Sequence, residues 1–152
     1  MKTLCAVLLA LLCGCSSLRD SAHGATALDA ATTAAGVASG AAVEVNPLIG
    51  SPAAFAGIML ARVIGVEMAD SMDEPARTQT LAGLNSIWWG VGISNVVVLI
   101  AASNPVGLAA GAMVGLGLWK STEMQREFSS LCASERLANP RLQCTFNGKD
   151  LL

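Results

Sequence analysis

The chain has 152 residues, of which 53% are hydrophobic and 13% are charged, and its formal net charge is −2. Soluble domains usually carry about 25% charged residues, so the composition is typical of a single membrane-associated domain. A near-neutral chain lacks the basic surface that nucleic acid requires, and we expect no nucleic-acid partner.

Residues 1–14 have the layout of a secretory signal peptide, with Lys2 ahead of a short apolar run and small residues after it. The sequence Leu12-Cys13-Gly14-Cys15 resembles the lipobox of bacterial lipoproteins. The resemblance implies cleavage after Gly14 and acylation of Cys15 with palmitate-type chains, which attach a protein stably to a membrane. Residues 15–24 then form a lipidated linker. The alternatives are an ordinary signal peptide or an uncleaved first helix.

Four apolar segments follow and predict a hydrophobic domain over residues 25–120. The last two are the more convincing membrane spans, because 81–103 has no charged residue and is long enough to cross a bilayer. Two Asn-Pro dipeptides interrupt the pattern, since proline disfavours helix at the residue before it. We therefore predict an all-α fold, a small four-helix membrane-embedded bundle of two helical hairpins. The predicted helices are 25–44, 52–69, 81–103 and 106–130, the last of which runs into a polar tail, 121–152.

Small residues recur every four positions in several of these segments, which places them on one stripe of each helix. Membrane helices associate through close backbone approach at such stripes, because apolar side chains gain little by leaving lipid. We predict that these positions mediate helix packing or oligomerisation: Gly57, Gly65, Ser86, Gly90, Ser94, Gly107, Gly111 and Gly115.

Charged residues inside apolar segments of membrane proteins usually face the bundle interior and pair. The candidates here are Asp29, Glu44, Arg62 and Glu67. In an antiparallel hairpin Arg62 lies near the level of Ala34, about 7.5 Å along the axis from Asp29 by helical rise. Its side chain can then reach Asp29 or Glu67. Such a group is either a structural ion pair or a proton or ion path.

A stretch of the first predicted hairpin carries a second resemblance. Asp29, Thr32-Thr33 and the turn Glu44-Val45-Asn46-Pro47-Leu48 resemble a pattern in a group of small uncharacterised bacterial membrane proteins. In that group an Asp and a Ser/Thr pair on the first helix precede a Glu-x-Asn-Pro turn. The resemblance implies an integral membrane domain without a known activity. The lipobox ahead of it departs from the pattern of the group.

Cys132 and Cys144 lie close together in the polar tail. In an exported protein such a pair predicts a disulfide that staples the tail. His23 is the only histidine and is expected to be solvated in the linker, so we predict no metal site. The single histidine also leaves no Ser–His or Cys–His pair for nucleophilic catalysis, and we expect neither an enzyme nor a cofactor.

These features predict a lipid-anchored protein on the periplasmic side of the bacterial cell envelope, acting as a structural or accessory component of a membrane assembly. Its expected partners are membrane lipid and either itself or another envelope protein. Two alternatives are open: a small ion- or proton-transport component, and a periplasmic lipoprotein whose apolar helices form a soluble core or an oligomer. Ser16 favours the outer membrane, whereas multispan helical proteins stay in the inner membrane, so the choice between membranes is open.

Overall fold

The computed structural model describes residues 17–40, 51–146 and 149–150. The predicted signal peptide, Cys15, Glu44 and the first Asn-Pro turn lie outside the described residues. The described part is mostly helical, which confirms the predicted all-α class. Its elements are α2 (Leu18–Ser39), α3 (Pro52–Asp70), α4 (Ala76–Ala101), α5 (Asn104–Ser121), α6 (Glu123–Ala138), β1 (Thr145–Phe146) and β2 (Lys149–Asp150).

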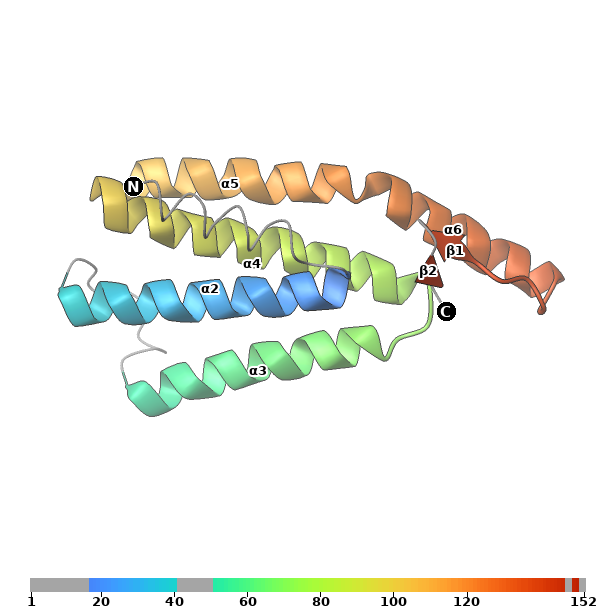
Figure 1. The fold of residues 1–152 in the computed structure, drawn as a ribbon, viewed down its shortest axis with the longest axis horizontal. Coiled ribbons are helices and arrows are strands. Elements are labelled where there is room, and N and C mark those ends of the chain that lie inside the picture. The colour runs from blue at the N-terminus through green and yellow to red at the C-terminus, as the bar shows by residue number, and fades with distance from the viewer. Residues whose placement is uncertain (1–16, 41–50, 147–148, 151–152) are drawn as a thin grey trace.

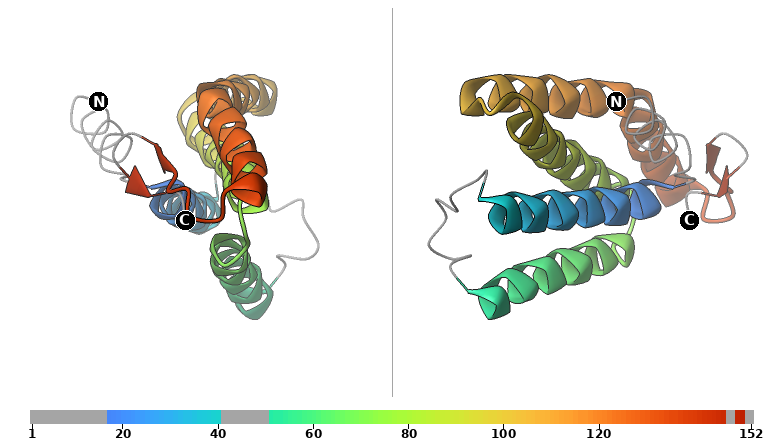
Figure 2. Two further views of the ribbon diagram at one scale, coloured as in Figure 1. Left: turned by 90° about the vertical axis from the view of Figure 1, so that its right-hand side faces the viewer. Right: turned by 60° about the vertical axis from the view of Figure 1, so that its left-hand side comes forward.

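The long helices form two antiparallel hairpins, α2–α3 and α4–α5, and α4 is the central element that contacts the other three. α4 contacts α5 on one side and α2 and α3 on the other (Figure 1). Figure 2 shows α4 running obliquely between α5 and α2. α6 continues beyond the end of α5 and contacts the start of α4, while β1 and β2 pair antiparallel beside it (Figure 1).

Local sequence sets the ends of these helices. The Ser17 hydroxyl accepts a hydrogen bond from a backbone amide in the first turn of α2, and Ser51 caps α3 in the same way. Gly40 ends α2 with φ of 66°, a left-handed conformation that glycine adopts without a Cβ clash. Ala102 ends α4 with φ of 49°, and Pro105 follows in the first turn of α5, where its missing N–H breaks no helical hydrogen bond.

The bundle has one charged end and one uncharged end. The charged end holds the start of α2, the end of α3, the start of α4 and the junction of α5 with α6 (Figure 1). Apart from Asp29 and Arg62, every charged residue of the described ranges lies at this end or further along α6 and the tail. The described residues 30–40, 51–61 and 88–106, toward the opposite end, contain none.

Large apolar side chains lie mostly outside the bundle, and small or polar side chains fill its interior. In the described part, Trp89 and Leu81 are the largest buried apolar side chains, and most of the other buried residues are small or polar. In a water-soluble domain large apolar side chains are the ones most often buried. Those left more than half exposed here include Leu60, Ile87, Ile100, Leu108, Met113 and Leu116.

Length and composition mark two of the described helices, α3 and α4, as long and apolar enough to cross a membrane. The sequence had favoured 81–103 and 106–130 for this role. α4 agrees with that expectation, but α5 does not meet the measure because its glycines and its polar ends lower its mean hydropathy.

Several helix boundaries differ from the prediction. α2 begins at Leu18, so most of the predicted linker is helical. α4 begins at Ala76 rather than at residue 81. The predicted helix 106–130 is two helices, because α5 ends at Ser121 and α6 turns to contact the start of α4. The prediction for 52–69 is within one residue of α3.

Candidate functional site

Asp29 lies in the middle of α2, and its side chain is only 5% exposed. Its Oδ2 forms a salt bridge with the guanidinium of Arg62 from α3. Its Oδ1 accepts a hydrogen bond of 2.6 Å from the Asn95 amide nitrogen of α4. Three helices therefore meet at one carboxylate, and both of its oxygens have the partners that a buried charge requires.

The groups around this carboxylate also contact one another. The Arg62 guanidinium lies over the Trp88 ring, 5.5 Å from the ring centroid, in a cation–π arrangement. The amide nitrogen of Asn95 is also 3.3 Å from the Thr33 hydroxyl. The Arg62 side chain remains 21% exposed, so the ion pair is accessible from the surface only through Arg62. The arrangement neutralises its own charge and links the two hairpins.

α2 and α4 approach each other closely near Asp29, because the residues there are small or bond their polar groups within their own helix. A Cβ on Gly92 would lie 3.0 Å from the Leu28 side chain and 3.7 Å from the Asp29 amide nitrogen. Thr32 donates its hydroxyl to the carbonyl of Leu28 in its own helix at 2.9 Å. Such a bond satisfies a hydroxyl without a partner on another helix.

A second ion-pair network lies at the charged end. Arg19 donates to Glu67 from Nε at 3.2 Å and from Nη2 at 2.9 Å, and His23 Nε2 lies 2.8 Å from the same carboxylate. This corrects the expectation that Glu67 joins Arg62 in one path, and it corrects the expectation of a solvated His23. The physical reason is the early start of α2 at Leu18, which adds a helical turn opposite the end of α3.

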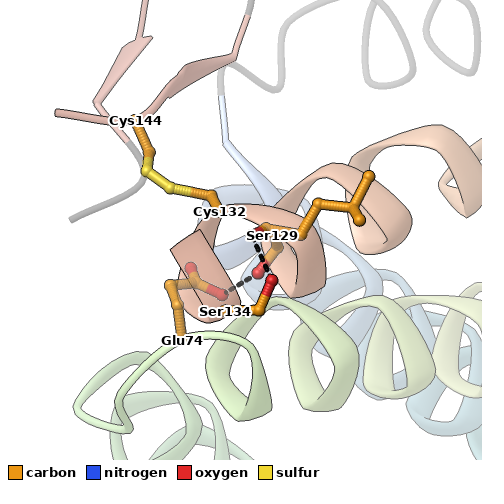
Figure 3. The surroundings of a disulfide bond; sticks show 6 residues. Glu74, Ser129, Cys132, Ser134 and Cys144 are labelled. Atoms are coloured by element: carbon orange, nitrogen blue, oxygen red, sulfur yellow. Dashed lines mark hydrogen bonds between the residues drawn. A yellow bond between two sulfur atoms is a disulfide. The ribbon is translucent and has the colours of Figure 1, made fainter. Parts of the chain in front are cut away.

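Glu74 ties α6 to the loop between α3 and α4, and its side chain is 2% exposed. Its carboxylate accepts hydrogen bonds from the Thr78 amide at 3.1 Å, the Thr78 hydroxyl at 2.8 Å and the Ser129 hydroxyl at 2.6 Å. One turn beyond Ser129, Cys132 pairs with Cys144, with 6.2 Å between their Cα atoms (Figure 3). The two cysteines therefore lie at disulfide distance, as predicted.

The small residues of α4 and α5 face each other. A Cβ on Gly90 would lie 2.9 Å from the carbonyl oxygen of Gly111, and a Cβ on Gly115 would lie 2.8 Å from that of Ser86. Contacts of this length leave no space for a side chain, so the two backbones touch directly. The residues in this interface are Ser86, Gly90, Ser94, Gly107, Gly111 and Gly115.

Gly57 and Gly65 of α3 behave differently. A Cβ on either residue would meet no atom within 4 Å. Within the described residues, these two glycines therefore pack against no other helix of the chain, and a role in oligomerisation stays a prediction. α3 instead turns Val66 and Ala69 inward, and both are fully buried. This contact is confined to the end of α3 near the charged end of the bundle.

Sequence reasoning missed two members of these networks. Asn95 gave a readable signal, because an amide within an otherwise apolar segment usually faces another polar group. Glu74 gave none, because a carboxylate in a polar loop is ordinarily solvated. Its burial depends on α6 turning back over the loop, which spacing along the chain does not predict.

Comparison with models of known protein families, with curated proteins and with solved structures finds no match for this chain. In the part of the chain that the structure describes, no group of three or more His, Cys, Asp or Glu residues is placed to hold a metal ion. The contacts of Asp29 with Arg62 and Asn95 are those of a buried ion pair that holds three helices together.

Proposed function

We propose that this chain is a structural or accessory component of a membrane assembly in the bacterial envelope, embedded through its helices and anchored by acyl chains at Cys15. The proposal is supported by the distribution of side chains, since large apolar residues lie mostly on the outside and small or polar residues mostly in the interior. Exposed large apolar residues on three helices suit a lipid solvent, and close backbone contact suits helices that gain little from apolar burial. The chain acts through its surface and not through catalysis.

The contacts of Asp29 favour a structural role over the transport alternative. A proton or ion path needs a group whose charge or hydrogen bonding changes during the cycle. Asp29 has both oxygens partnered by residues of two other helices. Glu67, the other carboxylate of the predicted path, belongs to a separate network with Arg19. The Asp29–Arg62 pair therefore suits a structural link between helices better than a step in proton or ion transfer.

An extraction experiment tests whether the helices are embedded. A cleavable signal without a lipid site is fused directly to Ser16, so that the exported chain keeps the Ser17 cap and the Arg19–Glu67 pair. We expect the product to stay in the membrane pellet after alkaline carbonate treatment. Release of a folded soluble chain would contradict the proposal and support the soluble-core alternative.

A matched pair of substitutions sharpens that experiment. Leu108 and Met124 are 68% and 72% exposed, but Leu108 lies near the uncharged end and Met124 lies in α6. In water, lysine is tolerated equally at both positions. In a bilayer, Leu108→Lys places a charge in hydrocarbon at about 2.5–3.5 kcal/mol, whereas Met124→Lys does not. We therefore expect Leu108→Lys alone to reduce the amount of membrane-inserted protein. Equal effects of the two variants would indicate a water-exposed surface.

A further inference from the structure

An apolar groove follows the joint outer face of α4 and α5. Its volume is about 770 Å³, and Gly83, Gly90, Gly111 and Gly115 are among the small residues that line it. Larger side chains, such as Ile87 and Leu116, also line the groove and are themselves more than half exposed. The close backbone contact of the two helices produces this hollow, because small residues on both helices leave no side chains to fill it.

The dimensions of the groove suit an extended hydrocarbon chain. Its lining on α4 runs from Gly83 to Asn95. Twelve residues of helix span about 18 Å at 1.5 Å per residue. The hydrocarbon core of one leaflet is about 15 Å thick, half of the bilayer value. A single acyl chain therefore matches the groove in length.

At the charged end the groove meets Arg126, which interacts with the charge of Glu123 but forms no salt bridge among the described residues. The Arg126 guanidinium lies over the Trp119 ring, 3.6 Å from its centroid, and Trp119 lines the groove. Arg126 donates from Nη2 to the carbonyl of Trp119, but its Nε is buried without a hydrogen-bond partner among the described residues. Arg19, Arg62 and Arg77 each pair with a carboxylate, and no such pair forms at Arg126 in the described part.

A polar hollow of about 410 Å³ lies on the same side of α4. Gln79, Arg126, Glu127, Ser130 and Leu131 line it. Gln79 precedes Gly83 of the apolar groove by four residues, so the two hollows lie on one stripe of α4. The hollow therefore offers one cation and one anion next to each other, together with the amide of Gln79 and the hydroxyl of Ser130.

We propose that this continuous track binds one phospholipid with a zwitterionic amine headgroup, of the phosphatidylethanolamine type. One acyl chain lies in the α4–α5 groove, Arg126 binds the phosphate, and Glu127 binds the ammonium group. Charge complementarity selects this class, because Glu127 attracts the ammonium group, whereas the uncharged glycerol headgroup of phosphatidylglycerol offers it no cation. The quaternary amine of a choline headgroup cannot donate a hydrogen bond to Glu127. The inference rests on the membrane embedding that we propose above.

Native mass spectrometry of the full chain tests the site. The protein is purified in detergent micelles that contain equal amounts of phosphatidylethanolamine, phosphatidylglycerol and phosphatidylcholine. We expect one retained phosphatidylethanolamine per chain. Arg126→Gln should lower this retention by about tenfold, the effect of losing one charge-assisted hydrogen bond of about 1.4 kcal/mol. Arg136→Gln, on the same helix but away from both hollows, should leave it unchanged.

A second matched pair tests the acyl groove without touching the charges. A Cβ on Gly83 would meet only the Trp119 ring, at 3.9 Å, so Gly83→Leu is compatible with the fold and extends a side chain into the groove. A Cβ on Gly117 would meet no atom within 4 Å, and that residue does not line the groove. We expect Gly83→Leu to abolish lipid retention and Gly117→Leu to preserve it.

The outcomes separate this inference from the proposed function. Equal retention of the three lipids, preference for phosphatidylglycerol, or unchanged retention in Arg126→Gln and Gly83→Leu overturns the lipid site. Any of these results leaves the membrane proposal standing if the protein resists carbonate extraction. Release by carbonate overturns the membrane proposal, and selective retention of phosphatidylethanolamine by the released chain still supports the site.

Discussion

The two hairpins of this bundle are held together by different means. In the α4–α5 hairpin, backbones touch across glycines and serines, and the contact continues along the length of α5. In the α2–α3 hairpin, α3 leaves Gly57 and Gly65 without neighbours and is attached by charge at two levels, Arg62 to Asp29 and Glu67 to Arg19. The first hairpin depends on shape, and the second depends on ion pairs together with the buried side chains of Val66 and Ala69.

The difference agrees with the membrane embedding that we propose, because an apolar solvent changes what stabilises a helix contact. Burial of leucine against leucine contributes little in lipid, which leaves close packing and polar contacts as the available means. α5 contains four glycines and does not reach the length and composition expected of a membrane span, and it is held by its close fit to α4. α3 is apolar enough to span and is held at a few polar points.

The largest effect is expected from a side chain placed in the shape-dependent hairpin. Gly111→Leu puts a side chain against the backbone of Gly90, which cannot move without separating the helices. Overpacking of well-packed interiors usually costs 1–3 kcal/mol, and we expect more than about 3 kcal/mol here because the obstacle is backbone. The measurement is the unfolding free energy in mixed detergent. Gly117→Leu is the control, and an equal loss there would show that the interface is not tight.

A smaller effect is expected from the charge-dependent hairpin. Asp29→Asn leaves Arg62 without its acid, and we expect a loss of about 3 kcal/mol, at the low end for a broken buried pair because Arg62 is partly exposed. The double variant Asp29→Asn with Arg62→Gln should be more stable than Asp29→Asn alone, since it removes the unpaired charge. The transport alternative predicts instead that Asp29→Asn keeps the fold and abolishes ion flux across vesicles.

The smallest effect is expected where the charge is exposed. Lys120 hydrogen-bonds Glu123 and holds the pKa of that carboxyl below its usual value of 4.5. A depressed folded-state pKa adds stability above the unfolded pKa, and this stability is lost as the pH falls through the folded value. We expect a slight drop in melting temperature as the pH falls below the usual carboxyl pKa value of 4.5, absent in Lys120→Gln. An unchanged slope in that variant would show that the junction of α5 and α6 is not held by this pair.

The sequence predicted the structure best where the pattern of residues within a single helix is sufficient to identify a contact. Spacing by four identified both sides of the α4–α5 interface, because small residues on a single stripe must face something that approaches closely. Counting back from a hairpin turn also placed Arg62 within reach of Asp29. The same counting left Glu67 open as a second partner, and only the position of Arg19 on α2 resolved it.

The features that were missed depend on the chain folding back on itself. The start of α2 at Leu18 brings Arg19 and His23 to Glu67 of α3, and the break before α6 reflects its contact with the start of α4. Gly57 and Gly65 show the converse. Together with Ala61 they form a stripe of small residues spaced by four, as the α5 glycines do. Such a stripe allows a neighbouring helix to approach closely, but it does not show that a neighbour lies there.

The link between Glu74 and Ser129 has a consequence for the order of biosynthesis. Glu74 belongs to the loop between α3 and α4, but its buried hydrogen bond comes from α6, which leaves the ribosome much later. The disulfide one turn beyond Ser129 closes only where thiols are oxidised. The polar loop near the middle of the chain therefore gains its last hydrogen-bond partner only after α6 has been synthesised, long after the loop itself.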